Sequence, residues 1–432
     1  MWKIRRIDIS FVVFVFAAAW LCLAMAPAGA ADAKTVFRRG IGVSHVMAWA
    51  AMEPGPSREF VFPPFSSVSD AQFAGELEAI HRTGFDFVRF AVDPGPFLQF
   101  QGTHRDFLDR MLIDRVKLIL ASGLAVIVDF HPSDMHPDYT AQALTAGVTA
   151  PVFQAYLRLL ERTAGLLDAL HSDKVALELM NEPPLPPRAW QPMLDAAYAA
   201  ARGRAAILIL VLEGGDEASP AGLMAMRTAA FANDPAALLS FHYYEPYQFT
   251  HQGASWNPAR YLADVPYPAR ARPLDDSLTA TAALIAASGI SEPRKSLAYQ
   301  DAQARLEAYR ASGFDAGTIA QDFARIAAWA HAQNIPGPRI LLGEFGARET
   351  ALQLSGPRAA ERAQWFRDVR RAAEANGFGW SVWAYRGGGF GLTVSDIANA
   401  IEPLVAAALG LRVDTARGEG AFPISPAPQR LP

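Results

Sequence analysis

Eight short apolar runs recur along the chain, and most of them are followed by a longer segment with helical spacing. The runs are Gly40–Ser44, Phe87–Ala91, Ala125–Phe130, Val175–Met180, Ala206–Leu212, Leu238–His242, Arg339–Gly343 and Gly379–Trp383. Near-continuous apolar runs are typical of parallel strands that are buried on both faces. Strand–helix alternation predicts an α/β fold, and eight repeats favour a closed (β/α)₈ TIM barrel. A doubly wound open sheet is the alternative, although no glycine-rich phosphate fingerprint follows the first run.

The helices between the runs are predicted from apolar spacing and end signals. Asp70 is expected to cap the first helix, and Gly84 is expected to end it. The other predicted helices are Arg105–Ala121, Val152–Leu170, Pro192–Arg202, Ile319–Gln333, Pro357–Asn376 and Ile397–Leu409. The connection between His242 and Arg339 is far longer than the rest and is expected to hold an extra helix near Leu278–Ser288. A connection of that length is usually functional.

Composition limits the class of protein. Hydrophobic residues make up 51% of the chain and charged residues 19%, which predicts one large packed core. The net charge of −4 argues against a nucleic-acid binder. We expect a single catalytic domain over residues 35–411 and a loose tail over 412–432 that is rich in Pro, Gly and Ala. The sequence does not indicate an oligomeric state.

Residues 1–30 have the pattern of a cleaved signal peptide. Basic residues near the start precede sixteen apolar residues, Phe11–Ala26, and small residues then lead to a cleavage position after Ala30. An uncleaved anchor is the alternative, but sixteen residues fall short of the ~20 that span a bilayer. We therefore expect an exported protein, periplasmic or extracellular, without membrane attachment. Cys22 is the single cysteine and lies in this segment, which excludes thiol chemistry in the mature chain.

Polar residues follow nearly every apolar run, where a barrel of this type has its active site. They are His45, Arg89, Asp93, Asp129, His131, Asn181, Glu182, Glu213, His242, Tyr244, Glu344 and Trp383. Glu182 and Glu344 each come directly after a buried run, on the fourth and seventh predicted strands. Two carboxylates across one ring are what glycoside hydrolysis needs. A lone strand-end glutamate would more often be an ion-pair partner, and structural roles remain open for His45, Asp93, Asp129 and Glu213.

Five motifs in this order resemble glycoside hydrolase family 5, the cellulase-like family. They are Arg39-Gly-Ile-Gly42, Phe87-Val-Arg-Phe90, Val128-Asp-Phe-His131, Met180-Asn-Glu-Pro183 and Gly343-Glu-Phe-Gly346. The resemblance covers roughly residues 39–409. After the sixth run, His242–Tyr247, Phe249–Ala254 and Trp256 look like the loop of members that act on β-1,4- and mixed-linkage glucans. Gly42 departs from the family pattern, which often has Asn there.

The resemblance implies a retaining β-glycosidase with Glu344 as nucleophile and Glu182 as acid/base. It implies that Arg89 and Tyr244 bond the Glu344 carboxylate and that Asn181 bonds the sugar 2-hydroxyl. The remaining residues expected to shape the sugar subsites are His131, His242, Trp383, His251 and Trp256. The expected substrate is a β-linked oligo- or polysaccharide, above all a β-glucan cut by an endoglucanase-like enzyme, and no cofactor or metal is expected.

Four alternatives remain open. An exo-β-glucosidase or a β-mannanase would fit the same scaffold. A metal-dependent hydrolase could use strand-end His and Asp side chains, but no His-x-His follows the first run. A non-catalytic carbohydrate-binding barrel would typically lack one of the two carboxylates, and both are present here.

Overall fold

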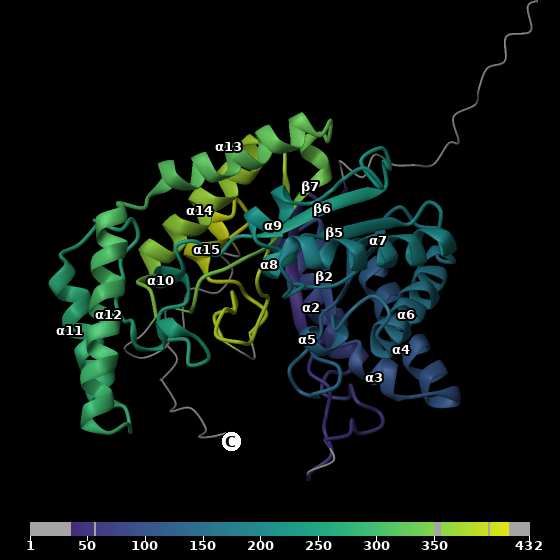
Figure 1. Ribbon diagram of the computed structural model, residues 1–432, viewed down its shortest axis with the longest axis horizontal. Coiled ribbons are helices and arrows are strands. Elements are labelled where there is room, and N and C mark those ends of the chain that lie inside the picture. The colour runs from purple at the N-terminus through teal and green to yellow at the C-terminus, as the bar shows by residue number, and fades with distance from the viewer. Residues whose placement is uncertain (1–35, 56–57, 350–355, 396–397, 414–432) are drawn as a thin grey trace, which may run out of the picture. The chain divides into compact units, whose positions relative to one another are not determined.

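A computed structural model describes residues 36–55, 58–349, 356–395 and 398–413; the predicted signal peptide and most of the predicted tail lie outside these ranges. Eight parallel strands form a closed barrel in sequence order, with β8 pairing back onto β1, so the predicted TIM barrel is confirmed (Figure 1). The strands are β1 (Arg39–Met47), β2 (Phe87–Val92), β3 (Ala125–Phe130), β4 (Val175–Glu178), β5 (Ile209–Glu213), β6 (Ala237–His242), β7 (Ile340–Phe345) and β8 (Gly379–Val382). No helix in the described part of the chain is long and apolar enough to cross a membrane.

Side chains along each strand point alternately into and out of the barrel, so the inward-pointing residues form layers. Apolar side chains such as Phe87, Ile127, Val211 and Leu341 fill one end of the interior. Gly40 leaves room for the Phe87 ring, which a Cβ at that position would meet at 2.2 Å. Because successive side chains on a strand alternate between faces, the residues two positions further on also point inward. That next layer is polar, and it consists of Arg89, Asp129, Glu178, Glu213 and Ser240.

The helices that follow the strands agree with most of the predicted segments. They are α2 (Asp70–Thr83), α3 (Gly95–Gln99), α4 (Gly102–Ala121), α5 (Ala141–Leu144), α6 (Pro151–Asp168), α7 (Pro187–Arg204), α8 (Gly215–Ala218), α9 (Pro220–Met224), α13 (Ala316–Ala332), α14 (Ala359–Ala375) and α15 (Pro403–Ala408), with a 3₁₀ turn η2 (Gly337–Arg339) before β7. A second, larger apolar cluster packs these helices against the outside of the strands.

Three predicted helix ends were wrong. Ser69, not Asp70, caps α2, because its backbone is extended and its hydroxyl accepts from the Gln72 N–H. Helix α7 begins at Pro187, and Pro192, predicted as the start, lies in its second turn. Helix α15 begins at Pro403 rather than at Ile397, which lies outside the described residues.

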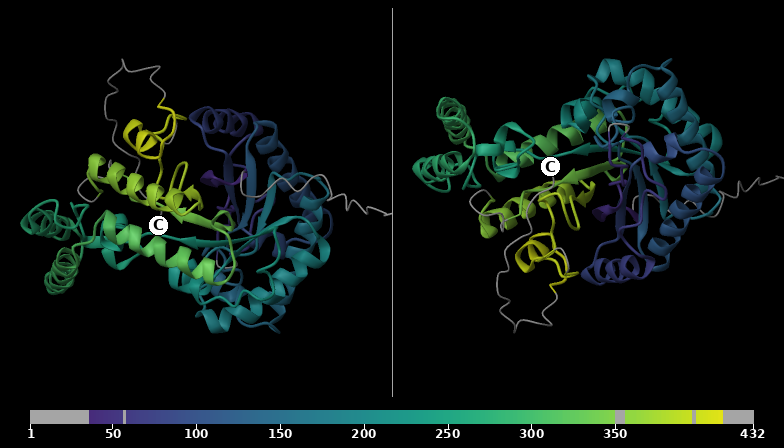
Figure 2. Two further views of the ribbon diagram at one scale, coloured as in Figure 1. Left: turned by 90° about the horizontal axis from the view of Figure 1, so that it is seen from above. Right: turned by 90° about the horizontal axis from the view of Figure 1, so that it is seen from below.

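The long connection after β6 contains α10 (Tyr247–Thr250), η1 (Pro258–Tyr261), α11 (Leu274–Ala287) and α12 (Glu292–Ser312). The predicted extra helix corresponds to α11, whereas α12 was not predicted because few apolar residues anchor it; its buried residues are Ala302, Leu306 and Tyr309. The α11–α12 hairpin projects away from the strands (Figures 1 and 2).

Candidate active site

Arg89 is the centre of the polar layer inside the barrel. Its Nε and Nη2 donate to the two oxygens of Glu178 at 2.8 and 2.6 Å, and its Nη1 donates to Glu344. Nη2 also donates to Asn181 Oδ1 at 2.7 Å and lies 3.1 Å from Asp129 Oδ2. A planar guanidinium with five N–H donors can hold several acceptors at fixed angles, which a lysine could not do.

Glu344, at the end of β7, is enclosed by donors and cations. Tyr244 donates its hydroxyl to Glu344 Oε2 at 2.8 Å, and His242 Nδ1 lies 3.7 Å from the same oxygen. Both contacts that the resemblance implied for this carboxylate, from Arg89 and from Tyr244, are present. Burial alone would raise the pKa of Glu344, but the positive charges of His242 and Arg89 outweigh it and hold that pKa below its usual value.

Glu182 follows β4 with a backbone φ of 44°, in the left-handed region that a non-glycine residue rarely adopts. Its N–H donates to Glu213 Oε2 at 2.8 Å, and its Oε1 lies 2.8 Å from His242 Nδ1. One carboxylate oxygen of Glu182 and one of Glu344 lie within 4.8 Å of each other. The two predicted carboxylates therefore face each other across a gap of that size.

The two histidines of the site carry raised pKa values. Burial lowers the pKa of His242, but the carboxylates of Glu213 and Glu344 raise it well above its usual value. Burial likewise acts against a raised pKa of His131, and Asp129, whose Oδ2 lies 2.9 Å from His131 Nδ1, outweighs that effect. Both rings thus favour the protonated, positively charged form beside Glu344.

A cleft of about 770 Å³ opens over these groups at the carboxyl ends of the strands. Eight of the ten predicted site residues line it: His131, Glu182, His242, Tyr244, His251, Trp256, Glu344 and Trp383. Arg89, in the polar layer, and Asn181, in the segment after β4, do not line it and are buried from solvent.

The walls of the cleft are aromatic. Trp383 stacks on His131 with ring centroids 5.2 Å apart, and a Cβ at Gly42 would meet the Trp383 indole at 2.5 Å. Gly42 therefore leaves the space that the Trp383 indole occupies. Trp49 and Trp256 line the cleft with 54% and 61% of their surface exposed, so both indoles present apolar surface to a ligand.

The buried His251 does not present its ring freely to the cleft. It stacks on Tyr247 at 3.8 Å between centroids, and its Nδ1 lies 3.0 Å from the Thr250 hydroxyl. Burial, with the nearby Arg348 charge, lowers the pKa of His251 to about 3, so the ring stays neutral. Arg348 in turn packs over the Trp256 ring at 5.1 Å.

Several site residues were not predicted. Glu178 was not selected, although a glutamate inside an otherwise apolar strand signals a buried cation, and Arg89 in the second strand supplies it. The turn labelled α8 also lines the cleft, and its residues Asp216, Glu217 and Ala218 have φ of 54°, 55° and 55°. No periodicity or motif marks such a left-handed turn in a sequence.

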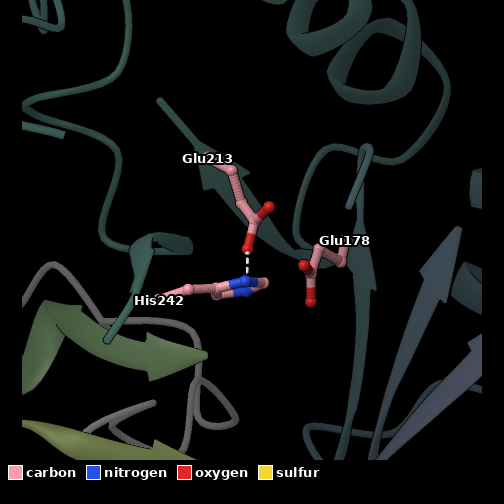
Figure 3. Close-up of side chains that lie close together, drawn as sticks. All are labelled: Glu178, Glu213 and His242. Atoms are coloured by element: carbon pink, nitrogen blue, oxygen red, sulfur yellow. Dashed lines mark ion pairs between the residues drawn. The ribbon is translucent and has the colours of Figure 1, made fainter. Parts of the chain in front are cut away.

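Two clusters in the described part of the chain have the spacing of metal ligands. One consists of Glu178, Glu213 and His242 (Figure 3), and the other of Glu182, His242 and Glu344. In the first, both Glu178 oxygens already accept from Arg89, and a cation would have to displace that guanidinium. His136, in the segment after β3, accepts from the Asp138 N–H and packs on Tyr139, so its ring is not directed at either cluster.

A closed parallel barrel with two glutamates facing each other across a cleft at its carboxyl end is the arrangement of a glycoside hydrolase. Residues 69–389 match the family described as "Cellulase (glycosyl hydrolase family 5)". The chain belongs to glycosyl hydrolase family 5, as the sequence motifs predicted.

One curated protein is similar to part of this chain in sequence, and solved structures share its fold. Endoglucanase 3 of Fibrobacter succinogenes is 27% identical over 165 residues, which cover 38% of this chain but only 22% of that protein. The cellulose synthase subunit Z of Clostridioides difficile has a similar structure, with a TM-score of 0.60 at 19% identity over 86% of this chain and 99% of the other. Endoglucanase Cel5A of Thermotoga maritima also superimposes, with a TM-score of 0.60 at 18% identity over 88% and 99%.

Proposed function

We propose that the protein is a retaining endo-β-glucanase in which Glu344 is the nucleophile and Glu182 the acid/base. The observation that carries this proposal is the approach of the two carboxylates to within 4.8 Å. Retaining glycosidases have their carboxyl groups about 5–5.5 Å apart, whereas inverting enzymes leave about 6.5–9.5 Å for a water molecule. The spacing of Glu182 and Glu344 supports the first class.

The reaction takes place in two displacements. A Glu344 oxygen attacks the anomeric carbon while Glu182 gives its proton to the departing glycosidic oxygen, so that a glycosyl–enzyme ester forms. Glu182 then removes a proton from water, the water oxygen attacks the same carbon, and Glu344 leaves as a carboxylate. Arg89 and Tyr244 keep Glu344 ionised and aimed, and Asn181 and His131 lie next to the expected position of the reacting sugar.

Two exposed indoles support action within a polysaccharide chain. Trp49 belongs to the loop after β1 and Trp256 to the loop after β6, so the two stand apart around the rim. Sugars bind to flat aromatic faces, and two separate platforms suit a substrate of several residues. Cel5A of Thermotoga maritima is described in complex with cellobiose and also with mannotriose, so a β-mannan is the alternative substrate.

A polysaccharide panel tests the substrate. The protein should lower the viscosity of barley β-glucan and carboxymethyl cellulose early and release a mixture of oligosaccharides, with laminarin and mannan less affected. Release of glucose alone would indicate an exo-β-glucosidase, and preference for mannan a β-mannanase. Inactivity on all four, with intact folding, would contradict the proposal. Activity should survive exhaustive chelation, because no step uses a metal.

We also propose that the protein is exported to the periplasm or outside the cell, on the strength of the signal-peptide pattern in residues 1–30. Mass spectrometry of the mature protein should find an N-terminus at Ala31. An intact residue 1–30 segment on protein retained in the membrane would indicate an anchor instead.

A further inference from the structure

Glu213 is a buried carboxylate at the end of β5 that has no role in the double displacement described above. It is 1% exposed. Its Oε2 accepts the Glu182 N–H at 2.8 Å, its Oε1 accepts the Ser240 hydroxyl at 3.0 Å, and the same Oε1 lies 2.8 Å from His242 Nε2. Glu213 therefore contacts the main chain of Glu182, the proposed acid/base, and also the ring of His242, which bonds the Glu182 side chain.

The main-chain contact falls on a strained residue. Glu182 adopts φ of 44°, which costs free energy for a residue with a Cβ and persists only where neighbours hold it. The Glu213 carboxylate supplies such a hold, because a charge-assisted hydrogen bond to a backbone N–H is short and strong. Loss of this bond would free the turn that aims the Glu182 side chain.

The side-chain contact runs through His242, which lies between two glutamates. Nδ1 is hydrogen-bonded to Glu182 Oε1 at 2.8 Å, whereas Nε2 forms an ion pair with Glu213 Oε1 at 2.8 Å without the geometry of a hydrogen bond. Figure 3 shows Glu213 on one side of the imidazole and Glu178 beside it. The charged and titratable groups around the ring are Glu178 and Glu182 from β4 and its end, Glu213 from β5, Glu344 from β7, Arg89 from β2, His131 after β3 and Tyr244 after β6.

We propose that Glu213 is a positioning residue for the acid/base: its carboxylate fixes the Glu182 main chain and keeps His242 protonated, so that the ring donates Nδ1–H to Glu182 Oε1. The proposal rests on the assignment of Glu182 as acid/base. With Oε1 occupied by that donor, Oε2 is the oxygen left to carry the proton for the leaving group. The raised pKa of His242, which burial would lower and Glu213 raises most, agrees with a charged ring.

Two substitutions separate the two contacts. Glu213→Gln removes the charge but keeps an oxygen that can accept the Glu182 N–H. Glu213→Asp keeps the charge but shortens the side chain by one methylene, which withdraws it from that N–H. Glu76→Gln is the matched control, because Glu76 is also a buried glutamate 2.8 Å from a histidine Nε2, that of His45, outside the cleft.

The first test needs no glycosidase activity. Ring ¹⁵N NMR of histidine-labelled full-length protein, with the His242 signals assigned by their loss in His242→Asn, follows the protonation of this ring. The wild type and Glu213→Asp should keep both ring nitrogens of His242 protonated to a higher pH than Glu213→Gln, in which the ring should titrate at least about one pH unit lower. An identical His242 titration in the wild type and Glu213→Gln would overturn the proposal.

The second test measures the dependence on the leaving group. In both Glu213 variants, kcat/KM for β-glucan should fall about 10- to 100-fold, while that for a dinitrophenyl cellobioside, whose leaving group needs no proton, should stay within about threefold. Glu76→Gln should change kcat/KM by the same factor for both substrates. Equal losses on both substrates in the Glu213 variants would show a merely structural role. A wild type without any glycosidase activity would refute the proposed function instead, and the NMR comparison would remain decisive for the Glu213–His242 coupling.

Discussion

The two carboxylates that face each other across the cleft lie in unlike surroundings. The Glu344 side chain is 5% exposed and is held by Arg89 and Tyr244, with His242 Nδ1 3.7 Å from its Oε2. The Glu182 side chain is 38% exposed, and its contact within the site is to His242. Cations around a buried carboxylate favour its ionised form, whereas an open side chain can exchange a proton with a bound molecule. These unlike surroundings support the proposed division of roles, with Glu344 as nucleophile and Glu182 as acid/base.

The largest effect is expected when the enclosed carboxylate of Glu344 is removed. Glu344→Ala should reduce glucan hydrolysis by about four or more orders of magnitude, because no ester can form without that oxygen. Azide should restore turnover of activated aryl glycosides by occupying the vacated space. Product NMR should then show a glycosyl azide of inverted configuration. Substantial hydrolysis without azide would break the assignment.

Removal of the open carboxylate should act selectively. Glu182→Ala should lower kcat/KM for glucan about 10²- to 10⁴-fold, the usual contribution of a general acid. Formation of the glycosyl–enzyme from a dinitrophenyl glycoside should persist as a pre-steady-state burst, and azide should give a product of retained configuration. A parallel loss of the burst would mean that Glu182 is not the acid.

Arg89→Lys tests how the surroundings of the enclosed Glu344 carboxylate set its pKa. A lysine keeps a positive charge but cannot reach Glu178 and Glu344 together as the guanidinium does, so Glu344 loses its ionic hydrogen bond or the charge lies farther from it. Because the nearby Arg89 charge lowers the pKa of Glu344, moving the charge away should raise this pKa. The acid limb of kcat/KM should move to higher pH, and the rate should fall about 10²-fold in proportion to the lost ionic hydrogen bond. An unmoved acid limb in a folded variant would contradict this role.

The smallest effect is expected at Tyr244. Tyr244→Phe removes one hydroxyl donor to Glu344 Oε2 and leaves Arg89 in place. One hydrogen bond to a charged group contributes about 1.5–3 kcal/mol. We therefore expect a roughly 10- to 100-fold loss of kcat, with the acid limb moving in the same direction as in Arg89→Lys but by less. Unchanged kinetics would show that the hydroxyl does not act on the nucleophile.

The barrel and the position of the two facing glutamates could be predicted from sequence because each depends on local patterns. Apolar runs mark the strands, and the residues directly after them must lie at one rim, which brings Glu182 and Glu344 together whatever the connections do. Helix ends were less predictable, since Ser69 and Asp70 are both good caps and backbone geometry decides between them. Helix α12 has little apolar periodicity to reveal it.

The polar layer under the site was harder to predict because the role of each residue depends on its contacts with residues on other strands. The burial of Glu178 is understood from its bonds to Arg89 on β2. The burial of Glu213 is understood from its contacts with the N–H of Glu182 after β4 and with His242 on β6. A single sequence shows which strand each residue follows but not which oxygen meets which nitrogen. The buried Glu178, whose pKa burial raises to about 7 against the lowering effect of Arg89, shows how far such neighbours shift one another.

The stereochemistry of the first product tests the central claim most directly. Proton NMR during early hydrolysis of a β-glucan oligosaccharide, before mutarotation, distinguishes the two anomers of the new reducing end. Carboxylates as close as those of Glu182 and Glu344 predict that the β-anomer appears first, through a covalent intermediate on Glu344. An α-anomer appearing first would mean that water attacks directly, and would contradict the division of roles between the two glutamates.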